Sequence, residues 1–332
     1  MKALLSKQTG GPDSLVLEDV PDPVAGPGEV LIAVRACGVN FPDALLISDR
    51  YQLKPPRPFA PGGEIAGVVE AAGAGVTTLR AGDRVIAMPG FGGMVQKIAV
   101  RAEQCIPMPD EMSFEHGATL VATYGTVYYG LDRRAHLAAG ERLLVLGAGG
   151  GIGLAAVELG RAKGAHVIAA ASSQEKVDLA LERGATSGFV YPSGADASDP
   201  RQLSQVFKQG CGPEGADVIC DAVGDVYAEA AIRAIAWGGR YLVIGFAGGK
   251  IPHLPLNLPL LKGCDVLGVL YGAHVQRDPA AARVELAELL QLYRDGRIRP
   301  HVSERFPLAD GGKAIAKIAA RQALGKLVVV CS

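Results

Sequence analysis

The most chemically informative segment of the sequence is a glycine-rich turn between an apolar strand and a helix. It reads RLLVLGAGGGIGLAAVELG, with a strand over Arg142–Leu146 and a helix that begins near Ile152. Ala148, Gly150 and Gly153 give an A-x-G-x-x-G spacing inside a longer glycine run. In a strand–turn–helix unit, such glycines permit a tight turn, close approach of the backbone to a pyrophosphate, and close packing of helix on strand. The pattern predicts a dinucleotide site formed by Gly147, Gly149, Gly150, Gly151, Ile152 and Gly153 at the positive end of the helix, with a purely structural turn as the alternative.

The end of the next strand indicates which nucleotide binds. An acidic residue about 20 residues after the glycines binds the ribose 2′-hydroxyl of NAD and repels a 2′-phosphate. Here the strand His166–Ala171 is followed by Ser172 and Ser173, no carboxylate precedes Glu175, and Lys176 lies one turn into the next helix. Two hydroxyls and a cation favour NADPH, and the alternative is that these three side chains are ordinary solvated surface residues.

Two later loops also follow strands of the same region. Asp221-Ala-Val-Gly224 follows the strand expected over Asp217–Asp221, and Gly245, Phe246 and Ala247 close the strand expected over Arg240–Phe246. Because nucleotides bind beyond the carboxyl ends of parallel strands, we expect Val223 and Gly245–Ala247 to contact the nicotinamide, mainly through their backbone groups.

The elements around these loops indicate two kinds of architecture. The first third of the chain consists of short β-rich segments separated by turns such as KPPRPFAPGG, which is typical of a small barrel or sandwich. From about Thr123, apolar strands alternate with helical patterns, which predicts a doubly wound parallel sheet. We expect a helix over Tyr227–Trp237, a strand over Asp265–Tyr271, and a final apolar strand, Lys326–Val330, that returns to the first domain.

Composition excludes several classes of protein. The 332 residues carry 33 Lys and Arg against 34 Asp and Glu, so no net charge attracts nucleic acid or an anionic membrane. The longest uncharged stretch near the middle is interrupted by glycines and is shorter than the ~18 residues of a membrane span. No targeting segment is recognisable, so we expect a cytoplasmic protein. The six cysteines form no C-x-x-C pair and have no histidine at metal-ligand spacing, which favours reduced, buried thiols.

Several motifs together resemble the medium-chain dehydrogenase/reductase superfamily, and within it the zinc-independent quinone oxidoreductases related to zeta-crystallin. The resemblance covers essentially the whole chain and rests on VRACGVNFPDALLISDRY, PFAPGGEIAGVVEAAGAG, ATYGTVYYGL, LGAGGGIGLAAVELG, ICDAVG and GKLVVV. It implies an α/β protein with a GroES-like β-barrel catalytic domain, residues 1–122 and 273–332, and a Rossmann domain, residues 123–272, that binds NADP. It also implies an active site in the interdomain cleft.

Departures from the zinc alcohol dehydrogenases of this superfamily point to a metal-free site. Those relatives carry a Cys-His pair in the first motif and Gly-His-Glu in the second, whereas this chain has Asn40, Phe41 and Gly63 there and retains only Glu64. Catalytic zinc needs three protein ligands. A quinone or an α,β-unsaturated carbonyl spreads the charge of an incoming hydride over a conjugated oxygen, so hydrogen-bond donors suffice to stabilise it. We therefore expect NADPH-dependent reduction of such a substrate, with no metal.

The resemblance also implies roles for individual side chains. Asn40 is expected to orient the substrate carbonyl or the nicotinamide ribose, Tyr51 to donate a hydrogen bond or proton to the developing oxyanion, and Asp43 to shape the pocket. The expected cofactor contacts outside the glycine turn are Thr123, Thr126, Tyr191 and Lys326. Each has a structural alternative: a turn residue at Asn40, a surface loop at Tyr51, local backbone support at Asp43, helix capping by the threonines, strand-end packing of Tyr191 and a solvated Lys326.

The sequence leaves two alternative functions open, and the resemblance also implies an oligomeric state. An enoyl-CoA or enoyl-thioester reductase would share the fold and cofactor, and would need a basic patch for the CoA phosphates, for which the candidates are Arg277, Arg297, Arg299 and Arg305. A non-catalytic NADPH-binding protein would bind the cofactor without turnover. The resemblance implies a homodimer formed through the cofactor domain, and an apolar edge strand over Asp265–Tyr271 would provide the pairing surface.

Overall fold

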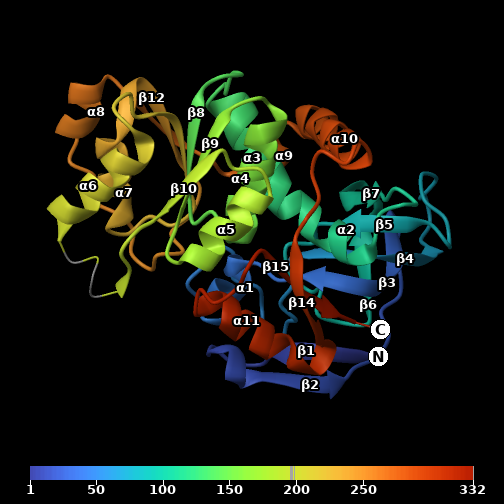
Figure 1. Cartoon of the computed structure of the whole chain (residues 1–332). Coiled ribbons are helices and arrows are strands. Elements are labelled where there is room, and N and C mark those ends of the chain that lie inside the picture. The colour runs from blue at the N-terminus through green and yellow to red at the C-terminus, as the bar shows by residue number, and fades with distance from the viewer. Residues whose placement is uncertain (195–196, 198, 332) are drawn as a thin grey trace. The chain divides into compact units, whose positions relative to one another are not determined.

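The computed structural model describes residues 1–194, 197 and 199–331, and it divides the chain into two compact units. Unit 1 contains Met1–Ala122 and the chain from Pro300 onward, which appear blue to cyan and red in Figure 1. Unit 2 is the continuous segment Thr123–Arg299. The chain therefore leaves unit 1, forms unit 2 and then returns.

Unit 1 is built on a barrel-like sheet whose strand pairs are antiparallel except for β14 with β15, which are parallel. Among its described residues, the sheet has the order β14-β15-β3-β4-β5-β7, β6 also pairs with β3, and β1 and β2 form a separate ribbon. Its strands are β1 (Lys2–Ser6), β2 (Leu15–Asp19), β3 (Glu29–Gly38), β4 (Glu64–Ala72), β5 (Arg84–Ala87), β6 (Lys97–Arg101), β7 (Cys105–Pro107), β14 (Val302–Pro307) and β15 (Lys326–Val330). Its α-helices are α1 (Phe41–Ile47), α2 (Phe114–Leu120) and α11 (Gly311–Ala319).

The last strand closes unit 1, as the sequence predicts. The first four residues of β15 (KLVVV) are buried, and β15 pairs antiparallel with β3, with Val329 opposite Cys37. Pairing with β3 satisfies the backbone of one edge of β15, and the helices α2 and α11 contact the strand, so burial of its apolar side chains stabilises the returning segment. The expected return of the chain to the first domain is confirmed.

Unit 2 is a doubly wound parallel sheet, and the expected α/β fold class is confirmed. In the described part of the chain its strand order is β10-β9-β8-β11-β12-β13, all parallel, which is the Rossmann order with a reversal between β8 and β11. The strands are β8 (Arg142–Leu146), β9 (His166–Ala171), β10 (Ser187–Val190), β11 (Ala216–Asp221), β12 (Ile235–Val243) and β13 (Asp265–Gly268). The helices are α3 (Thr126–Tyr128), α4 (Gly151–Ala162), α5 (Gln174–Glu182), α6 (Pro200–Cys211), α7 (Tyr227–Arg233), α8 (Asn257–Lys262), α9 (Tyr271–Arg277) and α10 (Pro279–Arg294).

The return to unit 1 comes later than the expected residue 273. Helices α9 and α10 belong to unit 2, because Arg133 donates to the buried carboxylate of Glu285 at 3.0 Å and His274 stacks on Tyr129 with ring centroids 4.2 Å apart. The sequence pattern shows that α10 is a helix but does not indicate which sheet it covers. The structure therefore assigns residues 273–299 to unit 2.

Two expected elements have different ends in the structure. The helix expected to reach Trp237 stops at Arg233, since Ile235 already pairs with Ala216 as the start of β12. The strand expected over Asp265–Tyr271 ends at Gly268, and Tyr271 begins α9. Local composition favours the longer elements, but pairing in the sheet fixes where each strand starts and stops.

Candidate functional site

The glycine turn in unit 2 has the geometry of a nucleotide loop. Strand β8 ends at Leu146, Gly147 takes a positive φ of 68°, and Gly150 caps the first turn of the 12-residue helix α4. The Gly150 N–H donates to the Gly147 carbonyl at 3.0 Å, which closes the turn. The free N–H groups at the start of α4 therefore follow directly on the carboxyl end of a central strand.

The glycines of this turn are required for different reasons. A Cβ on Gly153 would lie 2.6 Å from Ala148 Cα, and one on Gly149 would lie 2.7 Å from Lys176 Cβ, so the packing of the protein itself excludes side chains at both positions. A Cβ on Gly150 would meet nothing closer than the Gly147 oxygen at 3.5 Å. Its backbone is extended, at φ −89° and ψ 175°, and suits any residue. The protein leaves room at Gly150 that a bound ligand would use.

The hydroxyls after β9 lie next to this turn. Ser172 Oγ accepts a long hydrogen bond of 3.4 Å from Lys176 Nζ, and Lys176 packs on Gly149. Ser173 is the N-cap of α5, yet its Oγ is buried and has no hydrogen-bond partner among the residues that the structure describes. A buried polar atom without a partner costs free energy, and a ligand oxygen at this place would remove that cost.

The loops after β11 and β12 are bonded to each other at the same edge of the sheet. The buried carboxylate of Asp221 accepts the Val223 and Gly224 N–H groups at 2.7 and 2.9 Å. The N–H groups of Ala247 and Gly248 donate to the carbonyls of Ala222 and Val223. A Cβ on Gly147 would lie 2.8 Å from Val223 Cγ2, so the Val223 side chain also reaches the glycine turn. The predicted residues Val223, Gly245, Phe246 and Ala247 are therefore brought close to the turn, at the point where strand order reverses.

The other residues of unit 2 predicted to contact the cofactor are more enclosed. Thr123 is 3% exposed, in a π-helical turn that precedes Thr126 at the start of α3. Tyr191 is 5% exposed, and its ring packs with Tyr227 at 4.6 Å and Phe207 at 5.8 Å between centroids. This favours strand-end packing as the role of the Tyr191 ring.

Unit 1 contains a buried polar cluster around Asn40, which caps the start of α1. Asp43, on the first turn of α1, accepts the Asn40 N–H at 2.8 Å and the Gly62 N–H at 2.9 Å. Asn40 Nδ2 lies 3.4 Å from Glu64 Oε2, and Lys326 Nζ donates to Asn40 Oδ1 at 2.5 Å. Asp43, Glu64 and Lys326 are at most 4% exposed. Three chain segments far apart in the sequence thus meet at one amide.

Burial shifts the proton equilibria of this cluster. It raises the pKa of Asp43 to about 6, against the opposing effects of two backbone hydrogen bonds and the Lys326 charge. Burial also raises the pKa of Glu64 and lowers that of Lys326, and the attraction between these two groups opposes both shifts. The half-buried Tyr51 has a raised pKa, mainly through loss of solvation and further through the charge of Asp43, so its hydroxyl keeps its proton at neutral pH.

Part of this cluster was not recognised from the sequence. Glu64 had no assigned function, and Lys326 was expected to contact the cofactor or to be solvated, whereas the structure buries it against Asn40. The available signal was a charged residue at the start of each of two apolar strands, β4 and β15. A buried charge at a strand end requires a partner, but only the fold identifies that partner.

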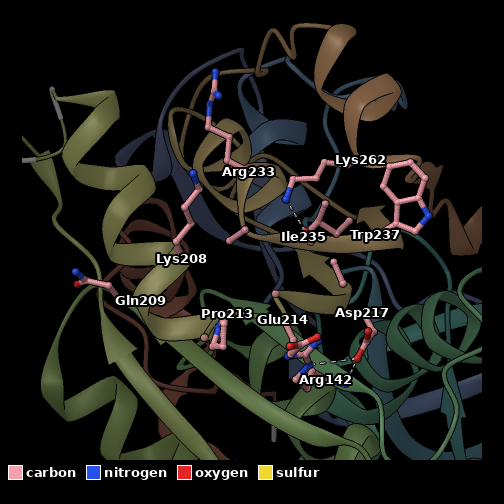
Figure 2. Close-up of a pocket in the computed structure, with 14 residues that line it drawn as sticks. Arg142, Lys208, Gln209, Pro213, Glu214, Asp217, Arg233, Ile235, Trp237 and Lys262 are labelled. Atoms are coloured by element: carbon pink, nitrogen blue, oxygen red, sulfur yellow. Dashed lines mark hydrogen bonds and ion pairs between the residues drawn. The ribbon is translucent and has the colours of Figure 1, made fainter.

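A large hollow in unit 2 lies away from the nucleotide loops. It has a volume of about 890 Å³. Its lining includes the first residues of β8 and β12, Arg142 and Ile235, and the second residue of β11, Asp217 (Figure 2). These are the amino ends of the strands, whereas the glycine turn follows a carboxyl end. Some of the charged side chains that line it bind one another or the backbone: Arg142 forms an ion pair with Asp217, and Lys262 donates a hydrogen bond to the Ile235 carbonyl. The hollow is therefore not the predicted cofactor site.

No group of three or more His, Cys, Asp or Glu among the residues that the structure describes could hold a metal ion. No helix in this part of the chain is long and apolar enough to cross a membrane.

Comparison with known proteins agrees with this architecture. Residues 26–110 match the family described as alcohol dehydrogenase GroES-like domain, and residues 151–289 match the family described as zinc-binding dehydrogenase. A rat protein named quinone oxidoreductase-like protein 2 is 38% identical over 317 residues, covering 95% of this chain and 88% of that protein.

Two solved structures are similar over nearly the full length. The quinone oxidoreductase of Thermus thermophilus, described alone and with NADPH, has a TM-score of 0.83 at 34% identity, covering 99% of this chain and 100% of that one. A mycobacterial protein solved in complex with NADPH has a TM-score of 0.91 at 29% identity, with coverage of 99% and 100%.

A GroES-like barrel unit combined with a Rossmann sheet defines a two-domain oxidoreductase of the medium-chain dehydrogenase/reductase superfamily. Within that superfamily, the chain belongs to the quinone oxidoreductase branch. The resemblance stated from the sequence motifs is confirmed.

The raised pKa of Asp43 predicts how stability depends on pH. Because the pKa is about 6 in the folded state and ~3.9 in an unfolded chain, folding favours the protonated acid. This stabilisation is complete below pH ~4 and is lost as the pH rises through 6. Relative to Asp43→Asn, which does not titrate, the free energy of unfolding of the natural protein falls by up to about 3 kcal/mol from pH 4 to pH 7. Urea unfolding across this range measures the difference, and parallel curves for the two proteins would contradict it.

Proposed function

We propose that this protein is an NADPH-dependent reductase that transfers a hydride to a quinone or an α,β-unsaturated carbonyl without zinc. The observation that carries the proposal is the unpartnered buried Ser173 hydroxyl, next to Lys176 and the glycine turn, at a strand end without a carboxylate. This donor set fits a 2′-phosphate and lacks the acid that would bind a free ribose hydroxyl. The names of the similar proteins, among them quinone oxidoreductases and NADPH complexes, support the same function.

Different residues of the chain bind the different parts of NADPH. The backbone of Gly147, Gly149, Gly150, Gly151, Ile152 and Gly153 holds the phosphates at the start of α4, and Ser172, Ser173 and Lys176 hold the 2′-phosphate. The backbone of Val223, Gly245, Phe246 and Ala247 orients the nicotinamide, with Thr123 and Thr126 as further contacts. NADPH supplies the hydride when it is bound.

In unit 1, we assign substrate contacts to Asn40 and Tyr51. The Asn40 amide and the Tyr51 hydroxyl are hydrogen-bond donors, and both stabilise negative charge on a carbonyl oxygen as it forms. A tyrosine hydroxyl is protonated at neutral pH, and Tyr51 is therefore the group that we assign as proton donor; burial raises its pKa, so it holds its proton more firmly and is a weaker acid. Asp43 supports this site indirectly by fixing the Asn40 backbone.

The residues present do not fit a catalytic zinc. Asn40 and Gly63 occupy positions where zinc-dependent relatives carry ligands, and Glu64 is engaged by the Ala122 N–H at 2.8 Å and by Asn40. A single carboxylate is not a catalytic zinc site. The proposed reaction therefore relies on hydrogen-bond donors.

Three of the four arginines considered for the phosphates of CoA have other contacts in the structure. Arg305 pairs with Glu115, the Arg297 guanidinium donates to the Ala162 carbonyl, and the Arg299 guanidinium lies over the Tyr293 ring. The carboxylate of Glu115 competes with a CoA phosphate for Arg305, which weighs against this alternative function. The second alternative, a protein that binds NADPH without catalysis, is decided by the activity assay below. The cytoplasmic location is still a prediction.

The direct test of the proposal is NADPH oxidation at 340 nm with 1,4-benzoquinone, 9,10-phenanthrenequinone, an alkyl enone and crotonyl-CoA, and with NADH in parallel. We expect turnover with the quinones or the enone, and kcat/KM at least tenfold higher with NADPH than with NADH. In the Asn40→Ala variant we expect kcat to fall about 100–1,000-fold, as for loss of one oxyanion donor. Preference for crotonyl-CoA would support the enoyl reductase, and NADPH binding without any turnover would support the non-catalytic alternative.

A second prediction separates the two roles of glycine in the turn. Gly153→Ala lowers the free energy of unfolding by about 1–3 kcal/mol because the methyl group meets backbone atoms. Gly150→Ala changes stability by less than about 0.5 kcal/mol, because its position is open, but weakens NADPH binding about tenfold or more. Urea unfolding and NADPH fluorescence titration measure the two effects, and unchanged NADPH affinity in Gly150→Ala would rule out the proposed phosphate site.

We also propose that two copies pair through strand β13, an edge strand of the unit 2 sheet. Trp237 on β12 and Leu260 on α8 are 80% and 78% exposed, and Leu256, Leu261 and Val266, at α8 and on β13, are exposed as well. Large exposed apolar patches beside an open strand edge are typical of protein interfaces.

Sedimentation velocity tests this assembly. We expect the natural protein to sediment as a dimer of 34.3 kDa chains, and Leu260→Asp to shift it toward the monomer because a charge is buried at the interface. Val24→Asp, at an 86% exposed position of unit 1, is the control and should leave the dimer intact. A monomeric natural protein would contradict the proposal.

A further inference from the structure

The proposed reaction leaves one buried cation of unit 1 without a function. Lys326 is 4% exposed, and its Nζ donates to the Val39 carbonyl at 3.1 Å and to Asn40 Oδ1 at 2.5 Å. A buried lysine is costly unless its charge is compensated and its protons are hydrogen-bonded. The position of Lys326 at the first residue of β15 therefore needs an explanation beyond packing.

The charged neighbours of Lys326 oppose the effect of burial, which lowers the pKa of its ammonium group. The groups that act on it from the elements packed around it are Glu64 on β4, Asp43 on α1 and Cys37 on β3. Burial raises the pKa of the Cys37 thiol well above its usual range, so this group stays neutral. The two carboxylates therefore provide the compensating charge.

The contacts of Asn40 determine which way its amide points. An ammonium group only donates hydrogen bonds, so the amide atom beside Lys326 must be the carbonyl oxygen. The opposite side of the amide is then the NH2 group, which makes two long contacts of 3.4 Å, to Glu64 Oε2 and the Gly38 carbonyl. The Gly38 carbonyl only accepts, which favours the same orientation.

We propose that Lys326 is a positioning residue that holds the Asn40 amide with its NH2 group as the donor, and that Glu64 is the second anchor of this orientation. Without Lys326 the amide keeps only its two long contacts, to Glu64 and the Gly38 carbonyl, so its orientation is held less firmly and its NH2 group is a poorer donor to a substrate oxyanion. The inference rests on the proposed function in one respect, namely that Asn40 contacts the substrate. It replaces the expectation that Lys326 touches the cofactor.

The kinetic test is a double-mutant cycle with Asn40→Ala and Lys326→Met. Because Lys326 acts through Asn40, we expect Lys326→Met to lower kcat for the quinone about 10–100-fold, and the double variant to be no slower than Asn40→Ala alone. The NADPH dissociation constant should change less than twofold. Multiplicative losses in the double variant, or a loss of NADPH affinity in Lys326→Met, would overturn the inference.

A matched pair of variants separates hydrogen bonding from stability. Met and Gln both remove the charge of Lys326, but only Gln retains an N–H donor for Asn40 Oδ1. We expect both variants to lose similar thermal stability, and Lys326→Gln to recover at least threefold in kcat over Lys326→Met. Equal kcat values in the two variants would indicate a merely structural role.

A spectroscopic readout keeps the inference testable if no acceptor is reduced. The side-chain NH2 signals of Asn40 in a ¹⁵N-correlated NMR spectrum are assigned by their loss in Asn40→Ala. We expect them to shift in Lys326→Met and to stay in place in Lys313→Met, which removes an exposed lysine that pairs with Asp310. Unchanged Asn40 signals in Lys326→Met would overturn the inference, whereas absent turnover with shifted signals would contradict only the proposed function.

Discussion

Unit 1 depends on the requirement that buried charges be compensated where they lie. Lys326 comes from the last strand, Glu64 from the start of β4 and Asp43 from the first turn of α1, and each of these side chains is enclosed. None of the three would be stable there alone, because an unpaired charge in a protein interior is strongly unfavourable. The returning strand therefore brings the cation that makes the two carboxylates tolerable. This mutual dependence links the closing of the fold to the orientation of Asn40.

A different constraint, close contact between backbone segments, shapes unit 2. Gly153 lets the first turn of α4 approach the end of β8 more closely than any side chain permits, and Gly147 turns the chain with a positive φ. The same approach leaves Gly150 open and brings Val223 to the turn. The close packing that excludes a side chain at Gly153 is thus found next to Gly150, where there is room for a ligand. The unpartnered Ser173 hydroxyl next to this space indicates that the site is shaped for a polar ligand.

The two units contribute different chemistry. Unit 2 offers backbone N–H groups, two serine hydroxyls and a lysine, which suit phosphate groups. Unit 1 offers an amide held by charged neighbours and a protonated phenol, which suit a carbonyl oxygen that gains negative charge. Membership of the quinone oxidoreductase branch agrees with this division.

The sequence by itself determined the features that depend on local pattern. The glycine turn, the boundaries of β8 and β9, the absence of an acid after Ala171 and the apolar last strand were all readable, because each rests on periodicity or on residue types at fixed spacing. Tertiary structure decided what depends on partners distant in the chain. Only the fold assigns α9 and α10 to unit 2, through contacts such as Arg133 with Glu285, and only sheet pairing makes Ile235 a strand residue. Likewise, 286 residues separate Lys326 from the Asn40 oxygen to which it donates. A sequence shows that such a charge must find a partner, but which partner it finds is fixed by how the strands assemble.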